Sequence, residues 1–195
     1  MSAFSHTPKT LIFSDYDGVV NPLQPFQFDK NSFVADRRQG DLDWSDELVR
    51  SINQIASNDQ ICWHWLTSNR QWMDWICENL GIDYSLTVTD DYGRGGYPDN
   101  KLDVIIRAIR SNDSCDATCP IIWIDDDLGK YYNNGHTMRK LRQLAQTTHS
   151  DVLMVQPNCH AGISRSQWNR IINFALHPNS RRTNSVTYLK PDYSE

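Results

Sequence analysis

The fold is decided by the stretch Thr10-Leu11-Ile12-Phe13-Ser14-Asp15-Tyr16-Asp17-Gly18-Val19-Val20-Asn21-Pro22. Its apolar first half is typical of a buried strand, and it runs into two aspartates separated by one residue and then into a glycine. Residues i and i+2 of a strand point to the same side, and an exit through glycine twists that relation. Asp15 and Asp17 can therefore converge on one metal-bound phosphate without both lying inside the sheet. The pattern suits a carboxylate that acts as a nucleophile.

Two later apolar runs also end in polar residues. Residues 61–66 lead into Thr67-Ser68-Asn69, and residues 120–124 lead into Asp125-Asp126-Asp127. Strands that alternate with helical segments predict a parallel sheet with helices on both faces and right-handed crossovers. Because ligands bind at the carboxyl ends of the strands in such sheets, we expect these polar residues to share one site.

The hydrophobic periodicity places the remaining elements. It predicts strands near 10–15, 61–67, 85–88, 120–125 and 151–156, and helices beginning near Ser45 and over 72–80, 99–111, 136–148 and 164–176. Gly81 is a good stop for the second helix. We expect one domain over residues 1–177, followed by a loosely ordered polar tail over residues 178–195.

The composition is that of an ordinary globular protein. The chain has 195 residues, 39% of them hydrophobic and 22% charged, with a formal net charge of −5. This charge gives no general attraction for nucleic acid, so an RNA or DNA partner would need a local basic patch. The candidates for that patch are Arg139, Lys140, Arg142, Arg165, Arg181 and Arg182.

Two further features concern location and cysteine use. No run approaches the length of a membrane span and the N-terminus lacks a signal sequence, so we expect a soluble cytoplasmic protein with no membrane partner. The five cysteines include no CxxC pair, which argues against a disulfide framework. A zinc site from Cys115, Cys119 and Cys159-His160 is an alternative, although zinc motifs show tighter spacing.

The ordered set of motifs resembles the haloacid dehalogenase (HAD) superfamily of phosphohydrolases, over roughly the first 165 residues. The set consists of the Asp-x-Asp-Gly-Val loop at Asp15, Thr67 after a strand, Lys101 at a helix start, and the acidic pair Asp125-Asp126. The resemblance implies an α/β fold: a single Rossmann-like, HAD-type, three-layer domain with a central parallel five-stranded sheet. It also implies a Mg²⁺-dependent phosphatase that acts through an aspartyl-phosphate intermediate.

The resemblance assigns the acidic residues to catalysis and metal binding. Asp15 would be the nucleophile, and Asp17 would protonate the leaving oxygen and then deprotonate the attacking water. Mg²⁺ would lie on the Asp15 carboxylate, the Asp17 backbone carbonyl and Asp126, with Asp125 in support. The alternative interpretation is that Asp15 and Asp17 cap a turn, because Asp-Gly is a common turn pair.

The remaining assignments concern the phosphoryl group. Thr67 would donate its hydroxyl to a phosphoryl oxygen, and Lys101 would set a positive charge against the nucleophile and the phosphate. Ser68, Asn69 and Arg70 would help to bind the substrate. In the alternative interpretation, Thr67 is only a helix N-cap and Lys101 an ordinary surface lysine.

The resemblance also bears on the substrate. HAD proteins often insert a cap domain, but residues 21–44 have room only for a flap hairpin, so we expect no large cap and an open site. An open site admits the end of a macromolecule. The segments 65–68, 123–128 and 162–164 are also similar to the small HAD domains of RNA-repair ("Swiss Army Knife") proteins, whose expected substrates are phosphorylated RNA or DNA ends. Candidates for gripping a larger substrate are Arg37, Arg38, Arg70, Arg94 and Arg165.

Two other functions stay open. One is a small-molecule or nucleotide phosphatase whose site is covered by the flap or by an oligomer partner. The other is a catalytically silent HAD-fold binding module, which predicts loss of the nucleophile, the lysine or the metal-binding acids. Asp15, Asp17, Lys101 and Asp126 are all present. The sequence leaves the oligomeric state open.

Overall fold

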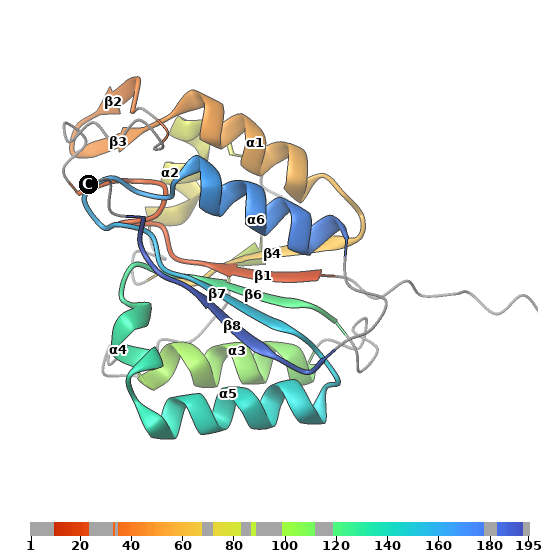
Figure 1. The fold of residues 1–195 in the computed structure, drawn as a ribbon. Coiled ribbons are helices and arrows are strands. Elements are labelled where there is room, and N and C mark those ends of the chain that lie inside the picture. The colour runs from red at the N-terminus through yellow and green to blue at the C-terminus, as the bar shows by residue number, and fades with distance from the viewer. Residues whose placement is uncertain are drawn as a thin grey trace, which may run out of the picture.

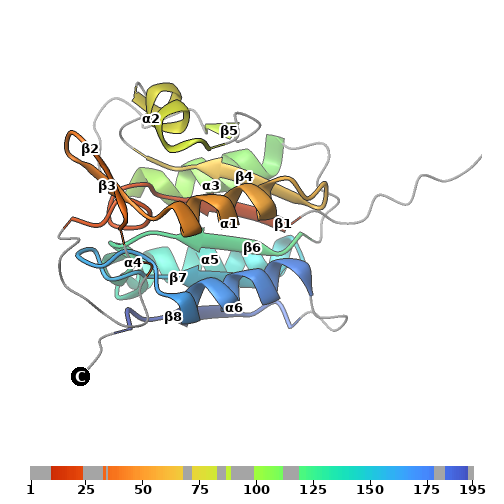
Figure 2. The ribbon, with the colours of Figure 1, turned by 90° about the horizontal axis from the view of Figure 1, so that it is seen from above.

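A parallel β-sheet runs through the middle of the molecule and is covered by helices on both faces, as Figures 1 and 2 show. The computed structural model of the chain describes residues 10–23, 33, 35–67, 72–82, 87–88, 99–111, 119–177 and 183–192. The fold is α/β and compatible with a Rossmann-like architecture, in agreement with the predicted fold class.

The main sheet has six strands within the described residues, in the order β5-β4-β1-β6-β7-β8, and all neighbouring strands are parallel. They are β1 (Thr10–Ser14), β4 (Ile61–Trp65), β5 (Thr87–Val88), β6 (Ile121–Ile124), β7 (Val152–Val155) and β8 (Val186–Leu189). Counted along the chain, the sheet strands run 3-2-1-4-5-6, so the order reverses between β1 and β6. Every residue of β1 is buried, as expected for the centre of a parallel sheet covered on both faces.

The helices form two layers, each packed on its own hydrophobic cluster. The upper layer in Figure 1 consists of α1 (Asp46–Ala56), α2 (Met73–Leu80) and α6 (Arg165–Leu176). The lower layer consists of α3 (Asp99–Ser111), α4 (Leu128–Tyr132) and α5 (Gly135–Thr147). Ser45 caps α1, and Gly81 ends α2 at a φ of +71°, so both predicted boundaries are confirmed.

Strand β8 corrects two predictions, the five-stranded sheet and the loosely ordered tail after residue 178. It pairs with β7 in a parallel register from Val152↔Val186 to Val155↔Leu189. The residues of β8, Val-Thr-Tyr-Leu, favour a strand, but there are only four of them between a segment rich in Ser, Asn and Arg and the pair Lys190-Pro191. So short a run does not by itself predict a strand, and the pairing with β7 depends on contacts between distant residues.

The crossovers into β7 and β8 also differ from expectation. Strands β6, β7 and β8 follow one another in one direction across the sheet. Helix α5 packs on one face of the sheet and α6 on the other. The β6–β7 and β7–β8 crossovers therefore have opposite hands, so they cannot both be right-handed as predicted.

A small antiparallel hairpin lies beyond the carboxyl ends of the strands, beside α1 (Figure 1). It consists of β2 (Arg37–Gln39) and β3 (Leu42–Trp44), joined through Gly40 at a φ of +60°. The hairpin occupies the segment in which the sequence left room for a flap.

Among the described residues, no group of Cys and His side chains is placed to hold a metal, and Cys115 of the zinc alternative lies outside the described residues. Cys62, Cys77 and Cys159 are not disulfide-bonded. Cys119 is disulfide-bonded, which the absence of CxxC pairs did not predict. None of the described helices is both long and apolar enough to cross a bilayer.

Candidate active site

Three aspartates meet where the strand order reverses. Asp15 directly follows β1, and Asp125 and Asp126 directly follow the neighbouring strand β6. The backbone N–H of Asp15 donates to the carbonyl of Ile124 at 2.9 Å, which brings the two strand ends into register. Carboxylate oxygens of the three aspartates all lie within 4.8 Å of one another. The structure thus gathers residues that are far apart in the sequence at the edge predicted for the site.

Lys101 connects two of these carboxylates. It lies in the first turn of α3, and its Nζ forms ion pairs with Asp15 Oδ2 and, at 2.6 Å, with Asp125 Oδ2. Only 11% of its side chain is exposed, so Lys101 is not an ordinary surface lysine. Among the described members of the cluster, one ammonium group faces three carboxylates, which leaves an excess of negative charge.

Asp125 has a supporting place in the cluster. Its side chain is fully buried, and its Oδ1 accepts the backbone N–H of Asp127 at 2.9 Å. Its Oδ2 accepts from Lys101. Because both oxygens are engaged within the protein, Asp125 is suited to holding the lysine and the turn, while Asp126 is better placed to bind a cation.

Gly18 makes room for the Asp126 carboxylate. It has a φ of +69°, which favours glycine, and an added Cβ would lie 2.5 Å from Asp126 Cγ. No side chain fits in that space without displacing the carboxylate. The glycine after Asp17 is therefore required by the close approach of the β1 and β6 loops.

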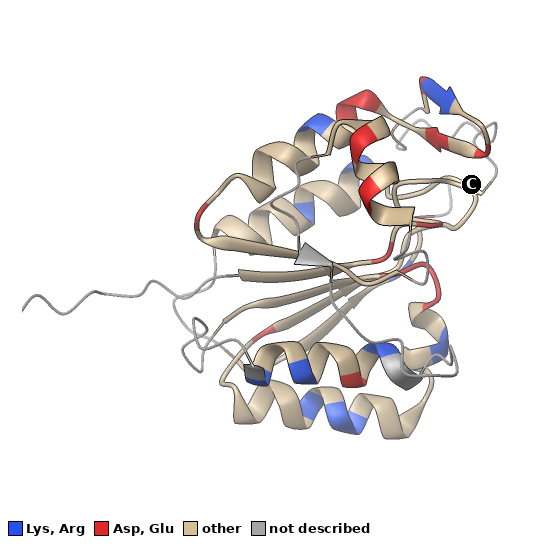
Figure 3. Ribbon diagram, turned by 180° about the vertical axis from the view of Figure 1, so that it is seen from behind, with Lys and Arg blue, Asp and Glu red and all other residues tan. Residues whose placement is uncertain are grey.

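Burial and neighbouring carboxylates raise the pKa values of two of the aspartates. Burial raises the pKa of Asp15 to about 7; Lys101 lowers it and Asp125 raises it. Burial, then Asp125 and Asp127, raise the pKa of Asp126 to about 6. A bound cation would favour the ionised form of both groups. Acidic segments of the upper helices and loops lie at the same end of the molecule (Figure 3).

Asp17 is held by a residue whose role the sequence did not reveal. Its Oδ1 accepts from Asn21 Nδ2 at 2.9 Å, and Asn21 Oδ1 accepts the backbone N–H of Asp43 at 3.0 Å. Asn21 therefore links the predicted acid/base residue to the hairpin. The sequence analysis assigned no role to Asn21, although its position four residues after Asp17 is compatible with this contact.

The predicted phosphate-binding residues are only partly described. Thr67 is buried at the carboxyl end of β4, the other neighbour of β1 in the sheet. Its position agrees with the prediction that it shares the edge with Asp15. Ser68, Asn69 and Arg70 lie outside the described residues, as does Arg94.

The described arginines do not form a basic surface at this edge. Each of the described gripping candidates pairs with an acidic side chain: Arg37 with Asp46, Arg38 with Asp43, and Arg165 with Glu47. The predicted nucleic-acid patch is also divided, because Arg165 lies on α6 and Arg139, Lys140 and Arg142 lie on α5, on the opposite face of the sheet. The described members of that patch therefore do not make one surface.

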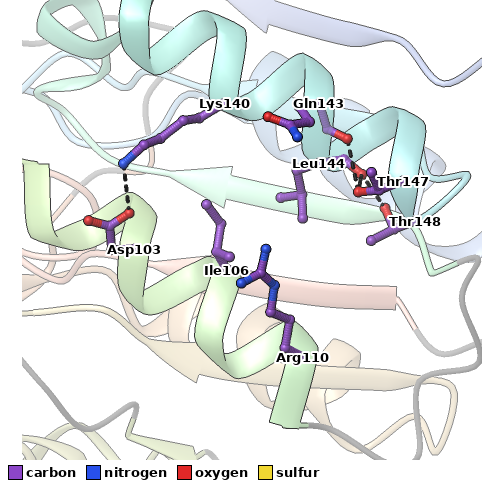
Figure 4. Close-up of a pocket in the computed structure, with 8 residues that line it drawn as sticks. All are labelled: Asp103, Ile106, Arg110, Lys140, Gln143, Leu144, Thr147 and Thr148. Carbon is purple, nitrogen blue, oxygen red and sulfur yellow. Dashed lines mark hydrogen bonds and ion pairs between the residues drawn. The ribbon is translucent and has the colours of Figure 1, made fainter.

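A groove of about 480 Å³ lies between α3 and α5, away from the three aspartates (Figure 4). Ile106 and Leu144 line it together with polar residues, and Lys140 pairs with Asp103 across it at 3.0 Å. The groove includes none of the predicted catalytic or metal-binding residues. It is a gap between two surface helices, separate from the candidate site.

Comparison with known proteins assigns no family to the chain: no protein-family model, no curated protein and no solved structure matches it. The cluster offers carboxylate oxygens without sulfur or imidazole ligands, and such sites suit Mg²⁺ and similar hard cations. The residues present thus fit the predicted magnesium ion.

Proposed function

We propose that this protein is a Mg²⁺-dependent phosphomonoester hydrolase of the HAD type, with no large cap over its site. The observation that carries the proposal is the pair of contacts from Lys101 to Asp15 and Asp125, with Asp126 beside them at the reversal of strand order. In this proposal Asp15 is the nucleophile, Lys101 is the cation beside it, and Asp126 belongs to a negatively charged metal pocket. Their closeness to one another supports these roles.

The first step transfers the phosphoryl group to Asp15. A carboxylate oxygen of Asp15 attacks phosphorus, and the bond from phosphorus to the ester oxygen breaks. Asp17 in its protonated form gives its proton to that departing oxygen. Asn21, bonded to Asp17 Oδ1, orients the carboxyl group for this transfer.

The second step regenerates the enzyme. Asp17, now ionised, takes a proton from a water molecule as the water oxygen attacks phosphorus. The bond between phosphorus and Asp15 breaks, which releases inorganic phosphate and restores the Asp15 carboxylate. Lys101 stays paired with Asp15 and offsets negative charge as the phosphate approaches.

Asp15 and Asp126, with the Asp17 carbonyl, would hold the magnesium ion. When bound, Mg²⁺ shields the approach of the anionic carboxylate to the anionic phosphate and neutralises charge in the transition state. Asp125 keeps Lys101 in place and Gly18 keeps the space for Asp126. These contacts support an active enzyme over a catalytically silent binding module.

Two substrate classes are proposed on different grounds. The open site that we expect, because residues 21–44 have no room for a large cap, favours the phosphorylated end of an RNA or DNA. The pairing of the described arginines with acidic side chains favours the second candidate, a small phosphoester or nucleotide, because it leaves little positive surface for a polyanion. A cytoplasmic location is part of the same proposal.

The test is phosphate release with and without Mg²⁺, from p-nitrophenyl phosphate, a mononucleotide and a 3′-phosphorylated RNA oligonucleotide. We expect Mg²⁺-dependent release that is lost in Asp15→Asn. Preference for the oligonucleotide would select the RNA-end substrate, and preference for the small esters would select the second candidate. Mg²⁺-dependent activity that survives in Asp15→Asn would refute the proposed function.

A further inference from the structure

We propose that Gln156 and Tyr188 are positioning residues of the metal site, so that the C-terminal strand β8 is a working part of it. The inference rests on the proposed function, because the site that they position is the proposed magnesium site. Neither residue was singled out by its sequence pattern. Gln156 directly follows β7, the neighbour of β6 in the sheet, and Tyr188 lies in β8.

The side chain of Gln156 joins the metal loop to β8. Its Nε2 donates to the backbone carbonyl of Asp126 at 2.7 Å, and its Oε1 accepts the hydroxyl of Tyr188. A carbonyl only accepts hydrogen bonds, so the amide nitrogen must face Asp126. The oxygen then faces Tyr188, whose hydroxyl donates to it. The tyrosine thus keeps the amide in the orientation that binds the loop.

This bond restrains the turn that carries Asp126. The peptide group between Asp126 and Asp127 is bound at both of its polar atoms. Its N–H, on Asp127, donates to Asp125 Oδ1 at 2.9 Å, and its carbonyl oxygen, on Asp126, accepts from Gln156. Next to this fixed peptide group, the Asp126 side chain lies against Gly18 and near Asp15. A preorganised ligand loses less conformational freedom when a cation binds.

The packing around Gln156 leaves it little freedom. An added Cβ on Gly129, at the start of α4, would lie 3.0 Å from Gln156 Oε1, so the helix approaches the amide closely. Tyr188 stacks on Tyr132 of the same helix, with ring centroids 4.2 Å apart and an interplanar angle of 19°. This stacking holds the ring of Tyr188, whose hydroxyl donates to the amide of Gln156.

The segment that carries Tyr188 is itself anchored to α6. Gln167 Nε2 donates to the backbone carbonyls of Gln156 at 2.7 Å and of Lys190 at 3.0 Å. Asp192 accepts the hydroxyl of Ser164, the N-cap of α6, at 2.5 Å. Through these bonds, the segment after residue 183 restrains Gln156 and the Asp126 loop that follows β6.

The test is the Mg²⁺ dissociation constant, measured by isothermal titration calorimetry, of the full chain and its variants. Gln156→Met keeps the length of the side chain but removes its polar atoms, and we expect Mg²⁺ binding about tenfold weaker. Tyr188→Phe, which removes only the hydroxyl, should weaken binding roughly threefold, a smaller effect of the same kind. Gln54→Met, at an exposed position on α1, is the matched control and should bind like the wild type.

A second readout separates positioning from general stability. If Gln156 only positions a ligand, raising the Mg²⁺ concentration should return the turnover of Gln156→Met toward the wild-type value. Tyr188→Phe carries the test if Gln156→Met does not fold. Wild-type Mg²⁺ affinity in a folded Gln156→Met or Tyr188→Phe would overturn the inference and leave the proposed function intact. Absence of Mg²⁺ binding by the wild type would instead refute the proposed function.

Discussion

Asp151 and Asp15 lie at opposite ends of the strands in the same sheet, Asp151 before β7 and Asp15 after β1. They differ in how well the surrounding groups compensate the charge of the carboxylate. Asp151 precedes β7, and its Oδ1 accepts four hydrogen bonds, from the backbone N–H and the hydroxyl of both Thr183 and Ser185. Burial alone would raise the pKa of Asp151, but these bonds outweigh it and lower the pKa. Asp15 follows β1, and burial raises its pKa to about 7 in spite of Lys101.

The difference separates a structural carboxylate, Asp151, from the one that we propose to be the nucleophile, Asp15. Asp151 has enough donors to stabilise its charge, and it fixes the chain that leads into β8. Asp15 shares one lysine with Asp125 and lies near Asp126, so its charge is only partly compensated. Folded proteins retain such unfavourable clusters where the missing charge is supplied by a ligand or a substrate.

The largest effect should follow from removing the Asp15 nucleophile. Asp15→Asn should lower turnover roughly a thousandfold or more, because the amide cannot form the phosphoenzyme. Asp151→Asn, the same change at the other end of the strands, should keep most of its turnover. Phosphate release from one substrate at saturating Mg²⁺ measures both variants. Equal losses of turnover in the two variants would show that Asp15 and Asp151 do not differ in function.

The same two variants should change stability in opposite directions when no metal is present. Asp15→Asn should stabilise the fold by roughly 1 kcal/mol at pH 7, because it removes a poorly compensated buried charge. Asp151→Asn should destabilise it by roughly 1–3 kcal/mol, because charge-assisted hydrogen bonds are lost. Urea unfolding in the presence of a chelator gives both values.

The stability changes in Asp15→Asn and Asp151→Asn should depend on pH over different ranges. The folded-state pKa of Asp15 is raised from 3.8 to about 7, so its contribution to stability is present below pH 4 and lost as pH rises toward 7. The advantage of Asp15→Asn should therefore grow over that range. The pKa of Asp151 is lowered, so the deficit of Asp151→Asn should shrink only as pH falls below about 4. Parallel pH profiles for the two variants would contradict this account.

A comparison of Gly18 with Gly40 tests whether Gly18 is required by the space for Asp126 or only by its positive φ. Gly18 and Gly40 both have a positive φ, but an added Cβ at Gly40 meets nothing within 4 Å. Gly40→Ala should cost roughly 1 kcal/mol from backbone strain alone and leave Mg²⁺ affinity unchanged. Gly18→Ala should also weaken Mg²⁺ binding roughly tenfold, because the methyl group displaces Asp126. Calorimetry and urea unfolding distinguish the two effects.

His64 serves as a control for burial without function. Burial lowers its pKa from 6.5 to about 4, and its ring stacks on Phe13. The unfolded chain takes up a proton first as pH falls from 6.5 toward 4, so wild-type stability should decline over that window. His64→Phe keeps a stacked ring and should remove roughly 1–3 kcal/mol of that decline. An unchanged pH profile in the variant would show that His64 is not the group responsible.

Prediction from sequence succeeded where local signals agree with the fold. The apolar runs of β1, β4 and β6 identified their strands, and each is followed by the polar residues that the edge of the sheet gathers. The helix signals at Ser45 and Gly81 were also reliable, because capping is a local interaction.

The remaining features depend on contacts between distant residues. Strand β8 gains its place by pairing with β7, and Gln156 matters because Asp126 lies 30 residues before it along the chain and Tyr188 lies 32 after it. Helix α4 is only five residues long, too short to show a period. The division of the arginine patch has the same cause, since composition does not indicate which face of the sheet each arginine will cover.

Detection of a phosphoryl group on Asp15 tests the central claim most directly. In Asp17→Asn the second step should slow because the base is lost, while p-nitrophenolate leaves without an acid. Incubation of this variant with p-nitrophenyl phosphate and Mg²⁺, followed by acid quench and peptide mass spectrometry, should show one phosphoryl group on Asp15. The double variant with Asp15→Asn should show none. A phosphoryl group on another residue, or hydrolysis by Asp15→Asn at the wild-type rate, would contradict the account.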